Sequence, residues 1–225
     1  MTGRPGLEGL EAYCREMGID LEPGQSALLR RFWAMVLEQN ARVNLTRITD
    51  DREAVLKHFV DSLTVLRAGV IHAGAKVADV GTGAGFPGVP LAIARPDVRV
   101  LLVEATGKRV KFLEGAVGAL GLKNVEVLHE RAEELARRTR GAGVADAVTA
   151  RAVAPLYRLV AWCVPLLRAG GHLVAMKGPD VSEELGQAEQ ALGKAGARVA
   201  AVHRLELPGG AGGRTLLVIR REAVG

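Results

Sequence analysis

Residues 77–88 constrain the fold of this chain more than any other segment, because an apolar run leads directly into a glycine-rich turn. The run contains the acid Asp79, and the turn contains Gly81, Gly83, Gly85 and Gly88. A strand that ends in such a turn brings bare backbone and a carboxylate to one edge of a sheet. Doubly wound α/β domains hold adenosine-containing cofactors in this way, so the segment predicts an α/β fold with a cofactor site.

Two cofactors compete for this turn. Gly83, Gly85 and Gly88 satisfy G-x-G-x-x-G, and Glu104 lies 19 residues past Gly85, where a dinucleotide-binding fold places its ribose acid. The acid Asp79 favours a different cofactor, because a carboxylate repels a pyrophosphate and attracts an ammonium group. S-adenosylmethionine carries such an ammonium, so it is the preferred cofactor, and a nicotinamide dinucleotide is the alternative.

The hydrophobic pattern predicts a helical N-terminal extension over residues 1–70 and a domain of alternating strands and helices over residues 71–225. Helices are expected over 26–39 and 51–67 in the extension, and over 88–95, 107–120, 131–139, 155–168 and 181–195 in the domain. Strands are expected over 76–80, 99–104, 125–129, 146–149, 171–176, 198–206 and 214–221. The alternation indicates a mostly parallel sheet with helices on both faces, and the last two consecutive strands indicate one antiparallel member.

Polar residues at the carboxyl ends of the expected strands form the candidate site, because ligands of open α/β sheets bind outside those ends. Glu104 closes the second strand, where its carboxylate can accept hydrogen bonds from both ribose hydroxyls. Ala132 and Glu133 follow the third strand, where they can edge an adenine ring, although Glu133 also fits an ordinary first-turn helix acid. Arg151 follows the fourth strand.

Charge and cysteine content narrow the function. Residues 71–178 carry 15 Lys and Arg against 9 Asp and Glu, so the positive excess lies on the cofactor domain. Lys108 and Arg109 belong to a basic cluster that can bind the phosphates of a nucleic acid.

The two cysteines are far apart and provide neither a disulfide framework nor a zinc site, and we expect no metal. The chain has no signal-like start and no apolar stretch long enough to cross a bilayer, so we expect a cytoplasmic protein without a membrane partner.

Several separate motifs, spread over residues 10–221, resemble one family. They are Asn44-Leu-Thr46, Lys57-His-Phe-Val-Asp-Ser-Leu63, the glycine turn from Asp79 to Gly88, Lys108-Arg-Val-Lys-Phe-Leu113, Thr149-Ala-Arg-Ala152 and Met176-Lys-Gly178. Together they resemble the RsmG (GidB) methyltransferases. The resemblance implies a Rossmann-like class I methyltransferase sheet preceded by helices, and transfer of a methyl group from S-adenosylmethionine to N7 of a guanine in small-subunit (16S) ribosomal RNA.

The resemblance also implies roles for single residues. Gly81 and Phe86 would contact the cofactor, Ala132 and Glu133 would hold its adenine end, and Arg151 would lie where methionine and target base meet. The wider methyltransferase pattern adds Asp79 beside the ammonium and Glu104 on the ribose, with Gly83 and Gly85 in the same turn. The sequence departs from the family in the last strand, where Thr215 follows Arg214 in place of the expected histidine.

Guanine N7 presents a lone pair and no proton, so positioning and electrostatics can supply most of the rate enhancement without a general base. We expect Arg151, Lys177 and His58 to act on the base, because Arg or Lys can donate to guanine O6 and His58 can donate or stack. The expected RNA contacts are Asn44, His58, Lys108, Arg109 and Arg214. Two of these residues also fit structural roles, His58 as an anchor of the helical segment and Asn44 as a cap or turn residue. Arg151 also fits the role of a structural arginine.

The predicted function is therefore methylation of small-subunit ribosomal RNA, free or in the ribosomal subunit, by a monomer. The first alternative is an NAD-dependent oxidoreductase, which Asp79 and the lack of a Tyr-x-x-x-Lys pair disfavour. The second is a non-catalytic RNA-binding protein that senses S-adenosylmethionine.

Overall fold

The computed structural model describes residues 7–139 and 142–223, in which one seven-stranded sheet has the order β3-β2-β1-β4-β5-β7-β6. Strands β1 to β5 run parallel to one another, and β7 runs antiparallel to both β5 and β6. The predicted fold class, a mostly parallel sheet with one antiparallel strand, is confirmed. The strands are β1 Lys76–Val80, β2 Arg99–Glu104, β3 Val125–His129, β4 Ala145–Arg151, β5 Leu167–Lys177, β6 Ala197–Leu207 and β7 Gly212–Arg221.

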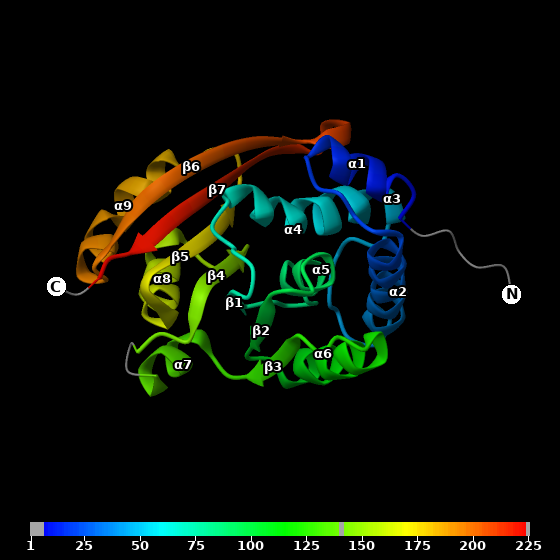
Figure 1. Cartoon of the computed structure of the whole chain (residues 1–225), viewed down its shortest axis with the longest axis horizontal. Helices are drawn as coiled ribbons and strands as arrows, with labels where there is room; N and C mark the ends of the chain where they lie inside the picture. Colours follow the sequence, from blue (N-terminus) through cyan, green and yellow to red (C-terminus); the bar gives the residue numbers. More distant parts are fainter. Residues whose placement is uncertain (1–6, 140–141, 224–225) are drawn as a thin grey trace, which may run out of the picture.

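Helices cover both faces of this sheet, with α5 and α6 on one side and α7, α8 and α9 on the other (Figure 1). The N-terminal helices lie on the side of α5 and α6, and α2 stands across the end of that layer. The α-helices are α1 Leu10–Glu16, α2 Pro23–Asn40, α3 Asp51–Ala54, α4 Asp61–Leu63, α5 Gly88–Ala94, α6 Gly107–Leu120, α7 Ala132–Arg138, α8 Leu156–Cys163 and α9 Ser182–Lys194. A π-helical turn, η1 Val55–Val60, and the 3-10 turns η2 Thr64–Ala68, η3 Val164–Leu166 and η4 Pro208–Gly210 complete the helical elements.

The strands form two cores because successive side chains point to opposite faces of the sheet. Val77 and Leu102 belong to the core that includes residues of α2 and α5, whereas Ala78 and Leu101 belong to the core that includes residues of α8 and α9. Strands that are apolar on both faces are typical of a parallel sheet covered by helices.

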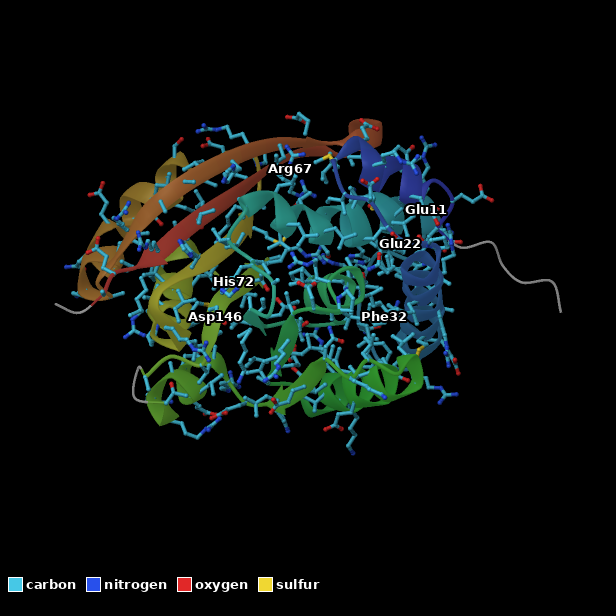
Figure 2. All side chains as sticks on the ribbon, in the orientation of Figure 1. Glu11, Glu22, Phe32, Arg67, His72 and Asp146 are labelled. Atoms are coloured by element: carbon cyan, nitrogen blue, oxygen red, sulfur yellow. The ribbon has the colours of Figure 1, made fainter. Side chains whose placement is uncertain are left out.

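An aromatic cluster joins the N-terminal helices to the glycine turn. Phe32 of α2, labelled in Figure 2, is fully buried. Its ring centroid lies 5.4 Å from that of Phe86 and 6.3 Å from that of Phe112 in α6. Phe59 of η1 also packs edge-on against Phe86, at 5.4 Å. The N-terminal segment is therefore packed directly against the turn after β1, through one continuous core.

The predicted helix over 155–168 is wrong in its second half. Helix α8 ends at Cys163, the turn η3 contains Pro165, and Leu167 already begins β5. Proline lacks the N–H that an interior helix position must donate, and its ring clashes with the preceding turn, so the helix stops there. The predicted helix over 51–67 is a continuous helical run whose hydrogen-bond pattern changes from α to π, back to α and then to 3-10.

The strand order reverses at β1. The chain builds β2 and β3 on one side of β1 and then returns to place β4 on the other side. Such a reversal opens a crevice outside the carboxyl ends of the two central strands. Asp79 of β1 and Thr149 of β4 are register partners at this edge, and Glu104 and Arg151 are the last residues of β2 and β4.

Candidate active site

The turn after β1 exposes bare backbone at this edge of the sheet. Gly81 has φ +66° and Gly83 has φ +61°, a left-handed conformation that glycine adopts without strain. A Cβ on Gly81 would lie only 2.9 Å from the side chain of Val153, which follows β4. Gly85 is buried farther back, where an added Cβ would lie 2.9 Å from Phe32. The first half of the turn is thus open to a ligand, and its second half is packed into the core.

Asp79 lies beneath the turn and organises it. Its carboxylate is fully buried, and Oδ2 accepts a hydrogen bond of 2.8 Å from the backbone N–H of Gly88. Oδ1 accepts a hydrogen bond of 2.9 Å from the hydroxyl of Thr149. Burial raises the pKa of Asp79 to about 6, against the opposing effect of these hydrogen bonds and of the positive charge of Arg151. Because Asp79 has no exposed surface, direct contact with a ligand ammonium requires the turn to move, and this role stays a prediction.

Glu104 joins the glycine turn to the end of β2. Its Oε2 accepts a hydrogen bond of 3.0 Å from the backbone N–H of Gly83, and its Oε1 accepts one of 2.8 Å from that of Thr106. Arg109 of α6 lies with Nη1 3.8 Å from Oε2. The side chain is only 5% exposed, and its two hydrogen bonds hold the carboxylate in a fixed position.

A hollow of about 360 Å³ lies against Glu104, and we call it the glycine-turn hollow. Small-molecule sites in proteins typically enclose ~300–1,000 Å³, so this space has the size of a ligand site. Four residues predicted to bind the cofactor line it together, namely Gly81, Glu104, Ala132 and Glu133. The remaining lining residues are Val80, Val103, Ala105, Arg109, Glu130, Arg131, Ala152, Val153 and Trp162.

The other predicted cofactor residues do not line this hollow. Asp79 and Gly85 lie behind it, and Gly83 acts through the hydrogen bond that its N–H donates to Glu104. Phe86 is 5% exposed and packs among aromatic rings instead. Arg109, which was predicted to contact RNA, lies on the hollow's wall beside Glu104.

A second hollow of about 600 Å³ brings together the three residues that were predicted to act on the base, and we call it the arginine hollow. His58, Arg151 and Lys177 all line it, and so does Arg214, which was predicted to contact RNA. The other lining residues are Thr46, Arg47, Ile48, Lys57, Asp61, Ala152, Met176, Gly178 and Glu184. The N-terminal segment, β4, β5 and β7 each contribute residues to this space.

Asp61 pairs with both arginines of this hollow. Nη1 of Arg151 donates to Oδ2 of Asp61 at 3.1 Å, and Nε of Arg214 donates to Oδ1 at 3.1 Å. Nη1 of Arg151 also donates to the carbonyl oxygen of Lys57 at 2.9 Å. One buried carboxylate at the start of α4 therefore fixes an arginine from β4 and an arginine from β7.

His58 forms the aromatic wall of the arginine hollow. Its ring stacks on Phe86 with centroids 4.5 Å apart and planes inclined by 12°, and its Nε2 lies 2.8 Å from the hydroxyl of Thr46. Burial, followed by the positive charge of Arg151, lowers the pKa of His58 to about 3. The imidazole is therefore neutral at physiological pH. The anchoring role left open above is supported by these contacts, because His58 links the loop after α2 to the glycine turn.

Lys177, at the end of β5, fastens the segment that follows β4. Its ammonium donates to the carbonyl oxygen of Ala154 at 2.9 Å and to Oε2 of Glu184 at 2.6 Å. The same Glu184 oxygen accepts a hydrogen bond from the backbone N–H of Leu156. Lys177 thus has defined structural partners, and its predicted action on a base stays a prediction.

Ala152 lines both hollows, so the two spaces meet at this residue. It has φ +53°, which is unusual for a residue with a Cβ and stores backbone strain. The next residue, Val153, is 36% exposed and leans over Gly81. Strained residues cluster at ligand sites, and this one lines both the hollow at the glycine turn and the hollow that holds the two arginines.

The remaining predicted RNA contacts lie outside the two hollows. Asn44 is exposed in the loop after α2, and Lys108 is exposed in the first turn of α6. Among residues 7–139 and 142–223, no three His, Cys, Asp or Glu side chains are grouped so that they could hold a metal ion. None of the helices in that part of the chain is both long and apolar enough to span a bilayer.

Sequence reasoning missed Asp61 and Thr46 as site residues. Both lie inside motifs that carried the family resemblance, Lys57 to Leu63 and Asn44 to Thr46, and this was the available signal. Asp61 lies 90 residues from Arg151 and 153 residues from Arg214, and Thr46 lies 12 residues from His58. These pairings depend on the tertiary fold.

Comparison with known proteins shows the family of this chain. The family model described as rRNA small subunit methyltransferase G matches residues 25–210. A Caldanaerobacter subterraneus subsp. tengcongensis protein named Ribosomal RNA small subunit methyltransferase G is 44% identical over 202 residues, which cover 90% of this chain and 84% of the relative. A protein of the same name from Desulforamulus reducens is 39% identical over 212 residues, covering 94% and 88%.

A solved structure supports the fold alone. The M. jannaschii TYW2 structure in complex with AdoMet has a TM-score of 0.56 to this chain at 16% sequence identity, and the match covers 77% of each chain. The family match and the relatives confirm the resemblance found in the motifs, so the chain belongs to the rRNA small subunit methyltransferase G family.

Proposed function

We propose that this protein transfers a methyl group from S-adenosylmethionine to N7 of a guanine in small-subunit (16S) ribosomal RNA. Family membership supports the reaction class. The single observation that carries the assignment of sites is that two hollows meet at Ala152. One has a ribose-type carboxylate and bare glycine backbone, and the other has two arginines and a neutral histidine.

The residues of the glycine-turn hollow fit S-adenosylmethionine. Glu104 fits a ribose acceptor, because its carboxylate is fixed by two backbone N–H groups and the residue lines the hollow. Gly81 leaves room for a ligand close to the backbone, and Ala132 and Glu133 line the far wall, where an adenine would lie. When bound, S-adenosylmethionine would supply an electrophilic methyl carbon. Guanine N7 would attack that carbon as its bond to sulfur breaks, S-adenosylhomocysteine would leave, and no proton would be lost.

The arginine hollow would hold the guanine. Arg151 and Arg214 can donate to O6, which would turn N7 toward Ala152 and the cofactor. His58 is neutral and offers a flat, partly apolar ring edge. Lys177 fixes the segment after β4 that separates the two spaces. In this assignment residues 71–225 form the methyltransferase domain, and residues 1–70 form an extension that completes the base pocket.

RNA contacts outside the pocket would come from exposed cations around both hollows. Arg47 at the arginine hollow and Lys108 on α6 are exposed, and Asn44 lies in the same loop as Arg47. Cations that neutralise phosphates make binding salt-dependent. The proposed partner is the small-subunit RNA or the assembled subunit, and we propose that the protein acts on it in the cytoplasm as a monomer.

Methyl transfer is tested directly with tritiated S-adenosylmethionine and small ribosomal subunits from cells that lack the modification. The proposal predicts incorporation of label into 16S RNA and recovery of the label as 7-methylguanosine after digestion to nucleosides. Label in another nucleoside would contradict the assignment of N7. Tight binding of S-adenosylhomocysteine without incorporation would favour the sensing protein, and binding of NADH alone would favour the oxidoreductase.

A further inference from the structure

The carboxylate of Asp61 is the only group in the described part of the chain that bonds to both Arg151 and Arg214. The side chains of the three residues are 5%, 15% and 23% exposed, respectively. The residues come from α4, β4 and β7, so this carboxylate ties the N-terminal segment to two strands of the sheet. Each arginine bonds to a different oxygen of the carboxylate, at 3.1 Å.

The arginines are held so that part of each guanidinium is left for a ligand. Arg151 uses Nη1 for both of its hydrogen bonds, and its Cζ lies 5.6 Å from the centroid of the Phe86 ring. Arg214 uses Nε toward Asp61 and Nη1 toward the carbonyl oxygen of Gly213. In the described residues Nη2 of neither arginine has a protein acceptor, and both residues line the arginine hollow.

Asp61 also lowers the positive charge beside the two arginines. The two guanidinium groups and this carboxylate carry a net charge of +1, and His58 adds none because its pKa is lowered to about 3. With Arg47, Lys57, Lys177 and Glu184, the whole lining of the hollow carries +3. Alkylation of guanine N7 moves a positive charge from the methyl donor onto the guanine ring. Two unpaired cations beside that ring would oppose the transfer, whereas a carboxylate between them offsets the developing charge.

We propose that Asp61 is a positioning residue for methyl transfer, which orients Arg151 and Arg214 toward the guanine and offsets the charge that develops on it. This role rests on the proposed function. It assigns to the N-terminal segment a direct part in turnover, in addition to its packing against the glycine turn.

The experiment compares wild type, Asp61→Asn and Asp61→Glu in methyl transfer to small ribosomal subunits. Each variant is assayed at a temperature at which circular dichroism shows that it is folded, and S-adenosylhomocysteine binding is measured by calorimetry. Asp61→Asn should lower kcat about ten- to one-hundred-fold, the loss expected for a hydrogen bond to a charged group. Asp61→Glu, which keeps the charge at a longer reach, should lie between the two. The Kd of S-adenosylhomocysteine should stay equal in all three proteins, because the glycine-turn hollow does not contain Asp61.

Asp146→Asn is the matched control. Asp146 lies at the opposite end of β4, where its Oδ1 accepts from Arg168 at 2.7 Å and its Oδ2 accepts from the backbone N–H of Lys76 (Figure 2). Its substitution also breaks an Asp–Arg pair, but far along the strand from the arginine hollow, so kcat should equal that of wild type.

A folded Asp61→Asn protein with kcat within about twofold of wild type would overturn the role of Asp61. If that variant does not fold, a kcat of Asp61→Glu within the same limit would overturn it. A wild-type protein that transfers no label would instead refute the proposed function, and the role of Asp61 with it. The two failures are distinguishable because the first appears only in the variants.

Discussion

The carboxylate of Glu104 accepts a hydrogen bond from the backbone N–H of Gly83 at 3.0 Å, which couples the end of β2 to the turn after β1. The two residues lie 21 positions apart in the sequence. A ligand that bonds to this carboxylate would therefore also affect the conformation of the glycine turn. A substitution of Glu104 should weaken cofactor binding for two reasons. The ligand loses a contact, and the glycine turn loses the hydrogen bond that orders it.

Replacing Glu104 by Gln tests this dependence. The amide cannot act as a charged acceptor, so one or more charge-assisted hydrogen bonds worth about 1.5–3 kcal/mol each are weakened. Calorimetry should show that S-adenosylhomocysteine binds about ten- to one-hundred-fold more weakly. Glu114→Gln is the control, because Glu114 is exposed on α6 away from the hollow. Equal affinity of wild type and Glu104→Gln would remove Glu104 from the site.

Replacing Gly88 by Ala should destabilise the protein. An added Cβ would clash with the side chain of Leu102 and would lie 2.8 Å from Oδ2 of Asp79, and both side chains are fully buried. Overpacking of this kind costs about 1–3 kcal/mol in the free energy of unfolding. Gly115→Ala is the matched control. Gly115 lies in α6 with open space around it, so the same substitution should stabilise the helix by about 1 kcal/mol. Urea unfolding of the two variants gives both values, and equal effects would contradict the packing described for the turn.

The sheet was predictable because each of its strands is a short apolar run between turn residues. Expected and observed strands agree closely, and β1, β2 and β3 match at both ends. The helix end at Cys163 was missed because apolar residues continue past Pro165, so the pattern alone extended the predicted helix to residue 168. The pattern also could not give the hydrogen-bond type of residues 51–68, since each α, π or 3-10 segment there spans only three to six residues, too few for its own period to appear.

The cofactor side of the site was more predictable than the base side. Gly81, Glu104, Ala132 and Glu133 follow strand ends, and parallel strands bring their carboxyl ends to one edge. Asp61 had no such cue, because its importance comes from arginines on β4 and β7 that only the folded chain brings to it. The burial of the Asp79 side chain also could not be predicted, since the sequence shows the acid but not the direction in which its side chain points.

Asp79 should give the protein an unusual pH dependence of stability. Its pKa is raised to about 6 by burial, so the folded protein binds a proton between pH 4 and 6 that the unfolded chain has already released. This contribution to the free energy of unfolding is fully present below about pH 4 and is lost as pH rises through about 6, by on the order of 3 kcal/mol in total. In Asp79→Asn the contribution disappears. The stability of wild type relative to Asp79→Asn should therefore be greater at pH 5 than at pH 7.5, and a pH-independent difference would contradict the burial of an ionisable carboxyl.

The pH dependence of stability that comes from His58 should have the opposite sign to that from Asp79. The pKa of His58 is lowered to about 3 by burial and by Arg151. As pH falls below 6.5, the unfolded chain therefore binds a proton at His58, whereas the folded protein does not. Its contribution to stability is present above pH 6.5 and is lost as pH falls toward 3. NMR of the histidine side chains, with the resonance of His58 assigned from a His58→Gln variant, should show no titration of His58 between pH 5 and 8. In urea-unfolded protein the same resonance should titrate near pH 6.5. A midpoint above about 5.5 in the folded protein would show that the ring is accessible.

The central claim is that a methyl donor and a guanine occupy two hollows that meet at Ala152. A crystal structure with S-adenosylhomocysteine bound tests it most directly. The ribose hydroxyls should lie on the carboxylate of Glu104, the adenine beside Ala132 and Glu133, and the sulfur at Ala152 facing Arg151. A ligand bound instead at the opposite edge of the sheet, in the hollow of about 420 Å³ lined by Lys76, Arg99 and Lys123, would contradict the account.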